Sequence, residues 1–251
     1  MSKNLLEYLN KSSMAAKKQH KEGIFLDNIH VFIKDAIIGD INLHNVLNKV
    51  KNSIPLHLFN GLDAIYVGQF KELQEKEVNA AFMDGALYLS NVQEDEESML
   101  EDIIHEVAHS LEEIANFNMY QDDYIYDEFL AKRLRLQKIL ESSGYNTSKQ
   151  NFTKLEYDSK FDKFLYEEIG YPILHTLTVN LFCSPYGATS LREYFANGFE
   201  FYFVKNRQLV KKISPQLYKK LLDVEKGEFS KEDTDDLSYW PLIKRVLWCE
   251  T

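Results

Sequence analysis

Residues 100–111 read Leu-Glu-Asp-Ile-Ile-His-Glu-Val-Ala-His-Ser-Leu and carry the clearest pattern in this 251-residue chain. Apolar residues recur there with the period of an α-helix, about 100° per residue, and therefore share one face. This face comprises Leu100, Ile103, Ile104, Val107, Leu111 and Ile114. The pattern predicts a helix over 94–116, with Asn91 as its N-cap and Glu94 completing a capping box.

His105 and His109 lie on the opposite side of this predicted helix, one turn apart, and Glu106 directly follows His105. Two imidazoles at that spacing can converge on one tetrahedral metal ion, and the glutamate can reach water held there without being a ligand. The HExxH spacing therefore predicts a zinc-dependent metallopeptidase with one Zn²⁺ per chain. His105 and His109 are the expected ligands, and Glu106 is the expected general base in peptide-bond hydrolysis. The alternative is a pair of surface histidines on a solvated helix.

The sequence before this helix has the character of strands. Residues 62–67 are mostly β-branched, aromatic or apolar and lie between Gly61 and Gly68, which predicts a strand. Asp84-Gly85 separates apolar runs at 80–83 and 86–90 and predicts a hairpin, because both turn positions need positive φ. We expect 86–90 to be a sheet edge beside the catalytic cleft, where an extended peptide can pair with it. An ordinary edge strand is the equal alternative.

Helical patterns occupy most of the remaining chain, and strand signals end near residue 93. The predicted helices span 3–20, 40–53 with Asp40 as N-cap, 122–143, 158–180, 190–206, 215–224 and 240–248. The expected fold class is α+β, with a small, mostly antiparallel sheet packed on a helix-rich C-terminal part. We expect one metallopeptidase domain over 1–251, with the sheet in 1–92 and the zinc site in 93–251.

A hydrolytic zinc ion needs a third protein ligand beside an open position. His175 is the only histidine after the motif, so a carboxylate is the expected ligand. Glu193 is the first candidate and opens an aromatic-rich helix. However, Ser190 and Glu193 also have the spacing of a capping box, which would tie this carboxylate to the backbone.

Other carboxylates remain open as third ligands. Glu128 lies 19 residues after His109, as in thermolysin-like enzymes, but Lys132 stands where that pattern has an aspartate. Glu112 and Glu113 lie on the motif helix itself, where a ligand would struggle to converge with both histidine rings. We expect these two to be solvated or to support the ligands.

The stretch 186–199 resembles the zinc-ligand region of the anthrax lethal factor family, gluzincin-type metallopeptidases that include the Pro-Pro endopeptidases. In that family a glutamate opens a Glu-aromatic-Phe-Ala helix and a tyrosine lies seven residues before it. Glu193-Tyr194-Phe195-Ala196 and Tyr186 fit this pattern. The resemblance implies a zincin-like fold, Glu193 as the third zinc ligand, and Tyr186 as a catalytic hydrogen-bond donor to the reacting carbonyl. Tyr194 and His175 are the alternatives for the role of Tyr186.

The resemblance covers about 60–205 and is specific only at the two motifs. Glu193 lies 84 positions after His109, a longer gap than is typical of these relatives. An inserted helical hairpin around 122–180 would account for the difference. The relatives favour proline-containing sites, but the residues that set this preference have no match here.

The expected partner is a peptide or protein substrate, and composition disfavours two other classes of partner. Thirty-nine acidic against 29 basic residues give a net charge of −10, which disfavours nucleic acid and anionic membranes. No apolar segment has the length of a signal peptide or a membrane span, so a cytoplasmic location is the default expectation. Secretion by another route and packaging in a particle are the alternatives. The two cysteines, Cys183 and Cys249, need not pair.

The competing function is a non-catalytic structural or interaction protein, such as a phage or toxin component, whose metal ion braces the fold. Such a closed site would need a fourth protein ligand, and Cys183 lies three residues before Tyr186. A regulatory metallopeptidase that cuts a repressor is a further alternative within the enzyme class.

Overall fold

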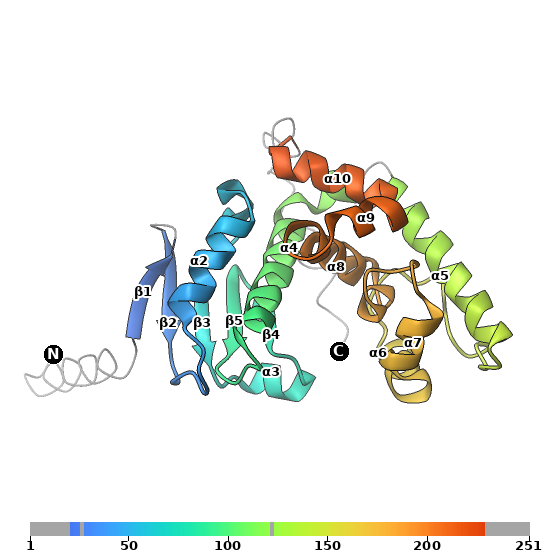
Figure 1. Cartoon of the computed structure of the whole chain (residues 1–251), viewed down its shortest axis with the longest axis horizontal. Coiled ribbons are helices and arrows are strands. Elements are labelled where there is room, and N and C mark those ends of the chain that lie inside the picture. Colours follow the sequence, from blue (N-terminus) through green and yellow to red (C-terminus); the bar gives the residue numbers. More distant parts are fainter. Residues whose placement is uncertain (1–20, 26–27, 121–122, 229–251) are drawn as a thin grey trace, which may run out of the picture.

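The computed structural model describes residues 21–25, 28–120 and 123–228, and the predicted helices at 3–20 and 240–248 lie outside them. The described chain is α+β, as predicted, with a sheet and α2 at one side and a helical part at the other (Figure 1). Helix α4, which carries the HExxH motif, lies between the two parts. None of the helices in the described ranges is long and apolar enough to cross a membrane.

The sheet has five strands in the order β1-β2-β3-β5-β4. Their bounds are β1 Lys21–Phe25, β2 Ile29–Ile33, β3 Ala64–Gly68, β4 Ala80–Met83 and β5 Ala86–Ser90. The two outer pairs, β1-β2 and β4-β5, are antiparallel, whereas β2-β3 and β3-β5 are parallel. The prediction of a mostly antiparallel sheet was therefore wrong, because helices cross over between the central strands.

The predicted hairpin is present, but the prediction that 86–90 forms the edge of the sheet was wrong. Asp84 and Gly85 have φ of 50° and 79°, as the turn requires. β5, however, pairs with β3 on one side and β4 on the other. The free edge therefore belongs to β4, since β5 returns from the turn into the parallel centre of the sheet.

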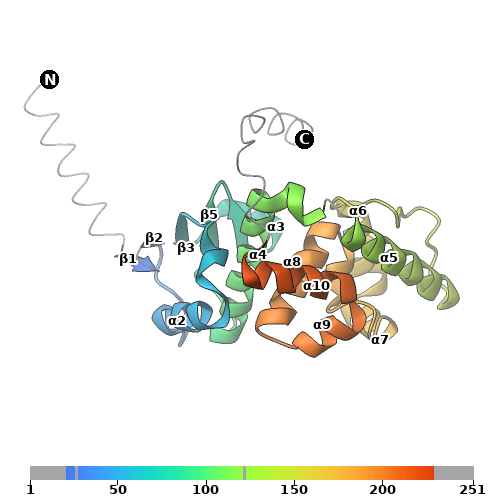
Figure 2. The same ribbon diagram turned by 90° about the horizontal axis from the view of Figure 1, so that it is seen from above.

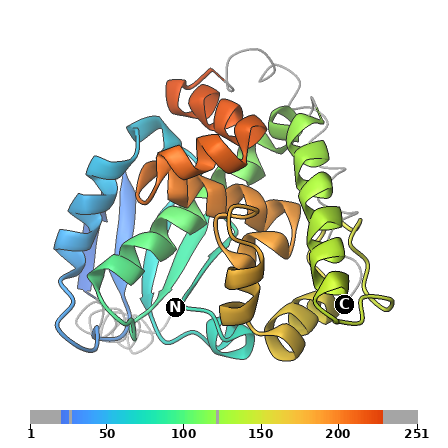
Figure 3. The same cartoon turned by 45° about the vertical axis from the view of Figure 1, so that its right-hand side comes forward.

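Helices α2 and α4 lie across one face of the sheet (Figure 3). The helices of the N-terminal half are α2 Leu43–Ser53, η1 Leu56–Phe59, α3 Lys71–Lys76 and α4 Glu96–Tyr120. The predicted apolar face of α4 is buried, since Ile103, Ile104 and Val107 are fully inaccessible. Burying side chains of this size stabilises the fold by roughly 1.5–3 kcal/mol each relative to exposure.

Two predicted caps are corrected by the structure. α4 begins at Glu96, and the Asp95 carboxylate accepts the Ser98 amide at 2.7 Å, so Asp95 caps this helix. Asn91 is instead buried and donates to the Ala36 carbonyl. Helix α2 is capped by Asn42, not by Asp40.

The helical part packs around α8 Leu191–Phe203, which lies between α4 and the outer helices (Figure 2). Its other elements are α5 Tyr124–Ser142, α6 Ser159–Lys163, η2 Phe164–Ile169, α7 Tyr171–Leu177, η3 Pro185–Ala188, α9 Arg207–Ile213 and α10 Pro215–Lys226. One cluster of buried side chains joins this part to the sheet. The helix predicted over 158–180 is broken at Gly170, which has φ of 84° and precedes Pro172 in the first turn of α7.

β1, β2, α3 and α9 had no sequence prediction. For β2 the signal was present but short, because its β-branched and aromatic residues form a run of only five positions. In the structure, contacts between aromatic side chains on neighbouring strands also stabilise β2. Phe32 stacks on Tyr66, and Tyr66 on Tyr88, at centroid distances of 5.1 and 5.2 Å across three adjacent strands.

Candidate metal centre

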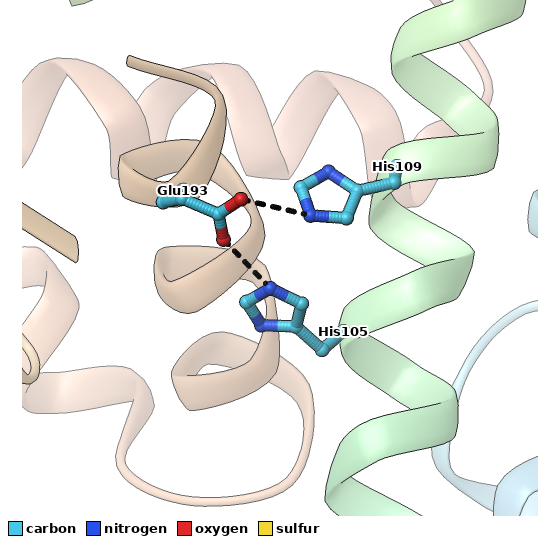
Figure 4. A group of neighbouring side chains, drawn as sticks. All are labelled: His105, His109 and Glu193. Atoms are coloured by element: carbon cyan, nitrogen blue, oxygen red, sulfur yellow. Dashed lines mark hydrogen bonds and ion pairs between the residues drawn. The ribbon is translucent and has the colours of Figure 1, made fainter. Parts of the chain in front are cut away.

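His105, His109 and Glu193 meet between α4 and α8 (Figure 4). Each offers one ligand atom, and these atoms lie within 4.8 Å of one another. The His105 Nε2 is 3.0 Å from Glu193 Oε2, and the His109 Nε2 is 3.6 Å from Glu193 Oε1. Two imidazole nitrogens and a carboxylate oxygen form a donor set that zinc prefers, and three protein ligands leave its fourth position open.

The local structure of α8 explains how Glu193 is free to face the histidines. Ser190 caps the helix, and its Oγ accepts the Glu193 amide at 3.1 Å. Only this half of the predicted capping box forms, because the Glu193 carboxylate turns away from the helix end toward α4. The Glu193 carboxylate is therefore not tied to the backbone at the start of α8.

The pKa values of the three side chains are shifted by close contact between opposite charges. Burial lowers the pKa of His105, but hydrogen bonds to Glu193 and Glu200 outweigh it and raise the pKa to about 10. Burial likewise lowers the pKa of His109, and its contacts with Glu112 and Glu193 raise it overall. Burial raises the pKa of Glu193, but the two imidazoles hold it well below its usual range. His109 is buried and His105 and Glu193 are partly buried, so the three side chains form a largely enclosed ion-paired group.

Each histidine also contacts a carboxylate through the nitrogen that faces away from Glu193. The His109 Nδ1 lies 3.0 Å from Glu112 Oε2, and the His105 Nδ1 lies 3.5 Å from Glu200 Oε2. Both carboxylates are buried. Such contacts orient zinc-binding imidazoles and make them better ligands. Glu112 was among the candidates for this role, while Glu200 was not.

Glu200 was missed because its position becomes meaningful only when α8 lies against α4. It follows Glu193 by seven residues, or two helical turns, so both face the motif helix. The Lys205 ammonium contacts Glu200 at 2.6 Å and Glu101 at 2.8 Å, which ties α8 to the beginning of α4. The seven-residue spacing within Glu193–Glu200 is the signal that sequence analysis could have used.

The contacts around Glu112 hold its carboxylate in place. Tyr120 donates its hydroxyl to Glu112 Oε1, and the Arg192 guanidinium lies 3.5 Å from Glu112 Oε2. The Arg192 Nε is also 3.0 Å from His109 Nδ1. A protonated Nδ1 of His109 donates to Glu112 and cannot also accept a hydrogen bond from Arg192. We therefore infer that the Arg192 guanidinium interacts with the Glu112 carboxylate.

Substituting glutamine for Glu200 or Glu112 is expected to weaken zinc binding by about 10–100-fold each, because the imidazoles lose a charged acceptor. The zinc dissociation constant can be measured by competition with a chromophoric chelator. Glu101→Gln is the matched control, since Glu101 contacts Lys205 but no histidine, and we expect a smaller change. Equal affinities in all three variants would contradict the assigned roles.

The Glu106 side chain extends from α4 to β4, the strand at the edge of the sheet. The side chain is buried, and its Oε2 accepts the Phe82 amide of β4 at 2.7 Å. This amide belongs to the edge strand, whose other side pairs with β5. The Glu106 charge helps to raise the pKa of His105, but its carboxylate is not among the three candidate ligands.

Tyr186 lies in η3, immediately before α8, with its ring centroid 6.3 Å from that of His105. Its backbone is fixed on both sides. The Tyr186 carbonyl accepts the Thr189 amide and hydroxyl at 3.0 and 2.8 Å, and the buried Asn197 side chain accepts the Ser184 amide at 3.0 Å. The tyrosine is thus held beside the histidine pair by the helix that carries Glu193.

The alternative residues lie elsewhere. Glu128 accepts the Tyr194 hydroxyl at 2.8 Å and the Gln216 and Leu217 amides, so it caps α10 and engages Tyr194 away from the histidines. His175 is exposed on α7. In the ranges that the structure describes, the metal-ligating group contains neither Glu128 nor Cys183. Cys183 is buried and free, and Cys249 lies outside these ranges.

Comparisons of the chain with protein-family models, with curated proteins and with solved structures give no match. The resemblance to the lethal factor family therefore rests on the residues of its two motifs.

Proposed function

We propose that this protein is a zinc-dependent endopeptidase of the gluzincin type. The observation that carries the proposal is the meeting of His105, His109 and Glu193, because Glu193 comes from a helix 84 residues further along the chain. Chance can place two histidines one turn apart. It does not readily add a partly buried carboxylate that faces both, together with a further carboxylate behind each imidazole.

The chain's own residues would divide the chemistry as follows. His105, His109 and Glu193 would hold zinc, which supplies Lewis acidity to water and to the scissile carbonyl when it is bound. Glu106 accepts a proton from the attacking water and returns it to the leaving amine. Tyr186 donates a hydrogen bond to the carbonyl oxygen as negative charge develops there. A donor of this kind stabilises the transition state by about 3 kcal/mol.

The proposal is tested with the full-length protein and a broad library of internally quenched peptides. We expect about one zinc per chain and hydrolysis that is lost on chelation and restored by zinc but not by magnesium. Zinc binding without cleavage of any peptide would instead favour the bracing metal of a structural protein. The structure supports the enzyme, since the described ligand group has three members and not four.

Zinc binding is expected to release at least one proton per ion at about pH 8, because a ligating imidazole must be neutral. The raised pKa of His105, about 10, keeps this imidazole protonated at that pH when no metal is bound. The apparent affinity should therefore rise with pH until this group has titrated. Calorimetric titrations in buffers of different ionisation enthalpy count the protons, and a buffer-independent enthalpy would contradict the expectation.

A further inference from the structure

The segment that lengthens the gap between the two motifs lies beside the candidate metal centre. Leu191 begins α8 and donates its amide to the Leu155 carbonyl at 2.8 Å, which places the chain before Tyr157 next to the turn that carries Glu193. Helix α7, which begins at Tyr171, packs against η3, the element that carries Tyr186. Both contacts are on the helical side of the molecule (Figure 1). The inserted segment therefore forms part of the surroundings of the site.

Two tyrosines of this segment converge on one carboxylate. The Tyr157 hydroxyl donates to Asp162 Oδ2 at 2.7 Å, and the Tyr171 hydroxyl donates to Asp162 Oδ1 at 3.2 Å. Tyr166 packs edge-on against Tyr171 with a centroid distance of 5.5 Å. Tyr157 is half exposed, so the cluster borders solvent. The cluster therefore places aromatic rings beside a negatively charged carboxylate near the surface.

The cluster lies within electrostatic range of the catalytic candidates. Burial raises the pKa of Tyr186, and the charges of Glu193 and Asp162 raise it further. Burial and the Asp162 carboxylate raise the pKa of Tyr157 and of Tyr171, and the Glu193 charge adds to both. These interactions agree with the backbone contacts and place Asp162 near the residue proposed to face the scissile carbonyl.

Within the described part of the chain, the Asp162 carboxylate has neutral partners only. Both of its contacts are phenol hydroxyls, and Lys154 pairs with Asp158 instead. Among the described residues, no lysine or arginine forms an ion pair with Asp162. A carboxylate beside exposed aromatic rings is a combination that binds ammonium or guanidinium groups. The net charge of −10 also attracts cationic peptides to the protein.

We propose that Tyr157, Asp162 and Tyr171 form the wall of a subsite that selects peptides with lysine or arginine next to the scissile bond. The inference rests on the proposed endopeptidase function, since Tyr186 marks the position of that bond. Asp162 pairs with the basic side chain, and the tyrosines fix the carboxylate and flank the cation. Asp162 is thus a specificity-determining residue.

The test uses zinc-loaded, full-length protein and peptide sets that differ only in lysine, glutamine or glutamate at one position flanking the cleaved bond. We expect kcat/KM to favour lysine over glutamine and glutamine over glutamate. Asp162→Asn should lower the lysine-to-glutamine ratio by about tenfold or more, as expected for loss of a charge-assisted hydrogen bond. Asp162→Lys should reverse the preference toward glutamate.

Asp158→Asn is the matched control. It removes the same charge at the N-cap of the helix that carries Asp162 and leaves an asparagine, which caps helices equally well. We expect it to keep the wild-type ratio. A ratio that is insensitive to Asp162, or that falls equally in the Asp158 variant, would overturn the subsite while leaving the peptidase proposal intact.

A binding measurement separates failure of this inference from failure of the proposed function. Fluorescence anisotropy of labelled lysine and glutamine peptides on zinc-loaded Glu106→Gln protein reports selection without turnover. A lysine preference that disappears in the Asp162→Asn, Glu106→Gln double variant supports the subsite even if no cleavage is found. Equal binding of both peptides rejects it.

Discussion

Zinc is expected to be lost from the protein when Glu193 is replaced by alanine. The carboxylate lies 3.0 Å from His105 and 3.6 Å from His109, so its removal leaves two of three candidate ligands. We expect the affinity for zinc to fall by at least about a thousandfold, which is more than the ~10–100-fold effect typical of residues behind the ligands. Elemental analysis after dialysis against a zinc buffer measures the loss.

Glu128→Gln is the matched control for the Glu193 experiment. Glu128 is the competing ligand candidate from the sequence, but the structure engages it with Tyr194 and the first turn of α10. This variant should retain zinc, and glutamine keeps an oxygen that can accept the Tyr194 hydroxyl. Undiminished zinc in Glu193→Ala, or loss of zinc in Glu128→Gln, would move the third ligand and remove the main support for the family resemblance.

Glu106→Gln is expected to abolish turnover while retaining zinc. Glutamine has nearly the same shape and can still accept the Phe82 amide that now binds Glu106 at 2.7 Å. It cannot take a proton from water, however, and loss of a general base lowers the rate by about 10²–10⁴-fold. Hydrolysis of a quenched peptide and the zinc content of the same sample measure the two effects together.

Glu97→Gln is the control for Glu106→Gln because it makes the same change at an exposed position in the first turn of the same helix. Wild-type turnover is expected in this variant. Retained activity in Glu106→Gln would show that another group takes the proton and would contradict the proposed mechanism. Loss of zinc in that variant would mean that Glu106 acts on the site through the histidines.

The functional-site prediction depends on how distant parts of the chain are brought together. His105, Glu106 and His109 needed only the period of one helix, since its buried apolar face fixes the side on which the histidines lie. Glu193 and Tyr186 were found through a resemblance between motifs, and the structure places both beside the histidines. Local patterns favoured Glu193 over Glu128 without deciding between them, because each lies in a predicted helix whose packing depends on distant contacts.

The sequence alone determined the local elements whose pattern is repeated over several turns or enforced by a turn. The motif helix, the Asp84-Gly85 hairpin and the α+β class follow from hydrophobic period and from the positive φ of two residues. These features depend on interactions between residues close in the chain. They were therefore available without knowledge of the packing.

Tertiary structure alone decided the sheet order, the edge strand and the groups behind the metal ligands. β4, and not β5, occupies the edge because β5 also pairs with β3, a choice between partners that strand patterns do not encode. Glu200 reaches His105 only because α8 packs against α4. Asp162, which accepts the Tyr171 hydroxyl, acts on Tyr186 electrostatically only because α7 packs against η3. Such contacts join residues far apart in sequence, and they follow from how the apolar faces of whole elements are buried together.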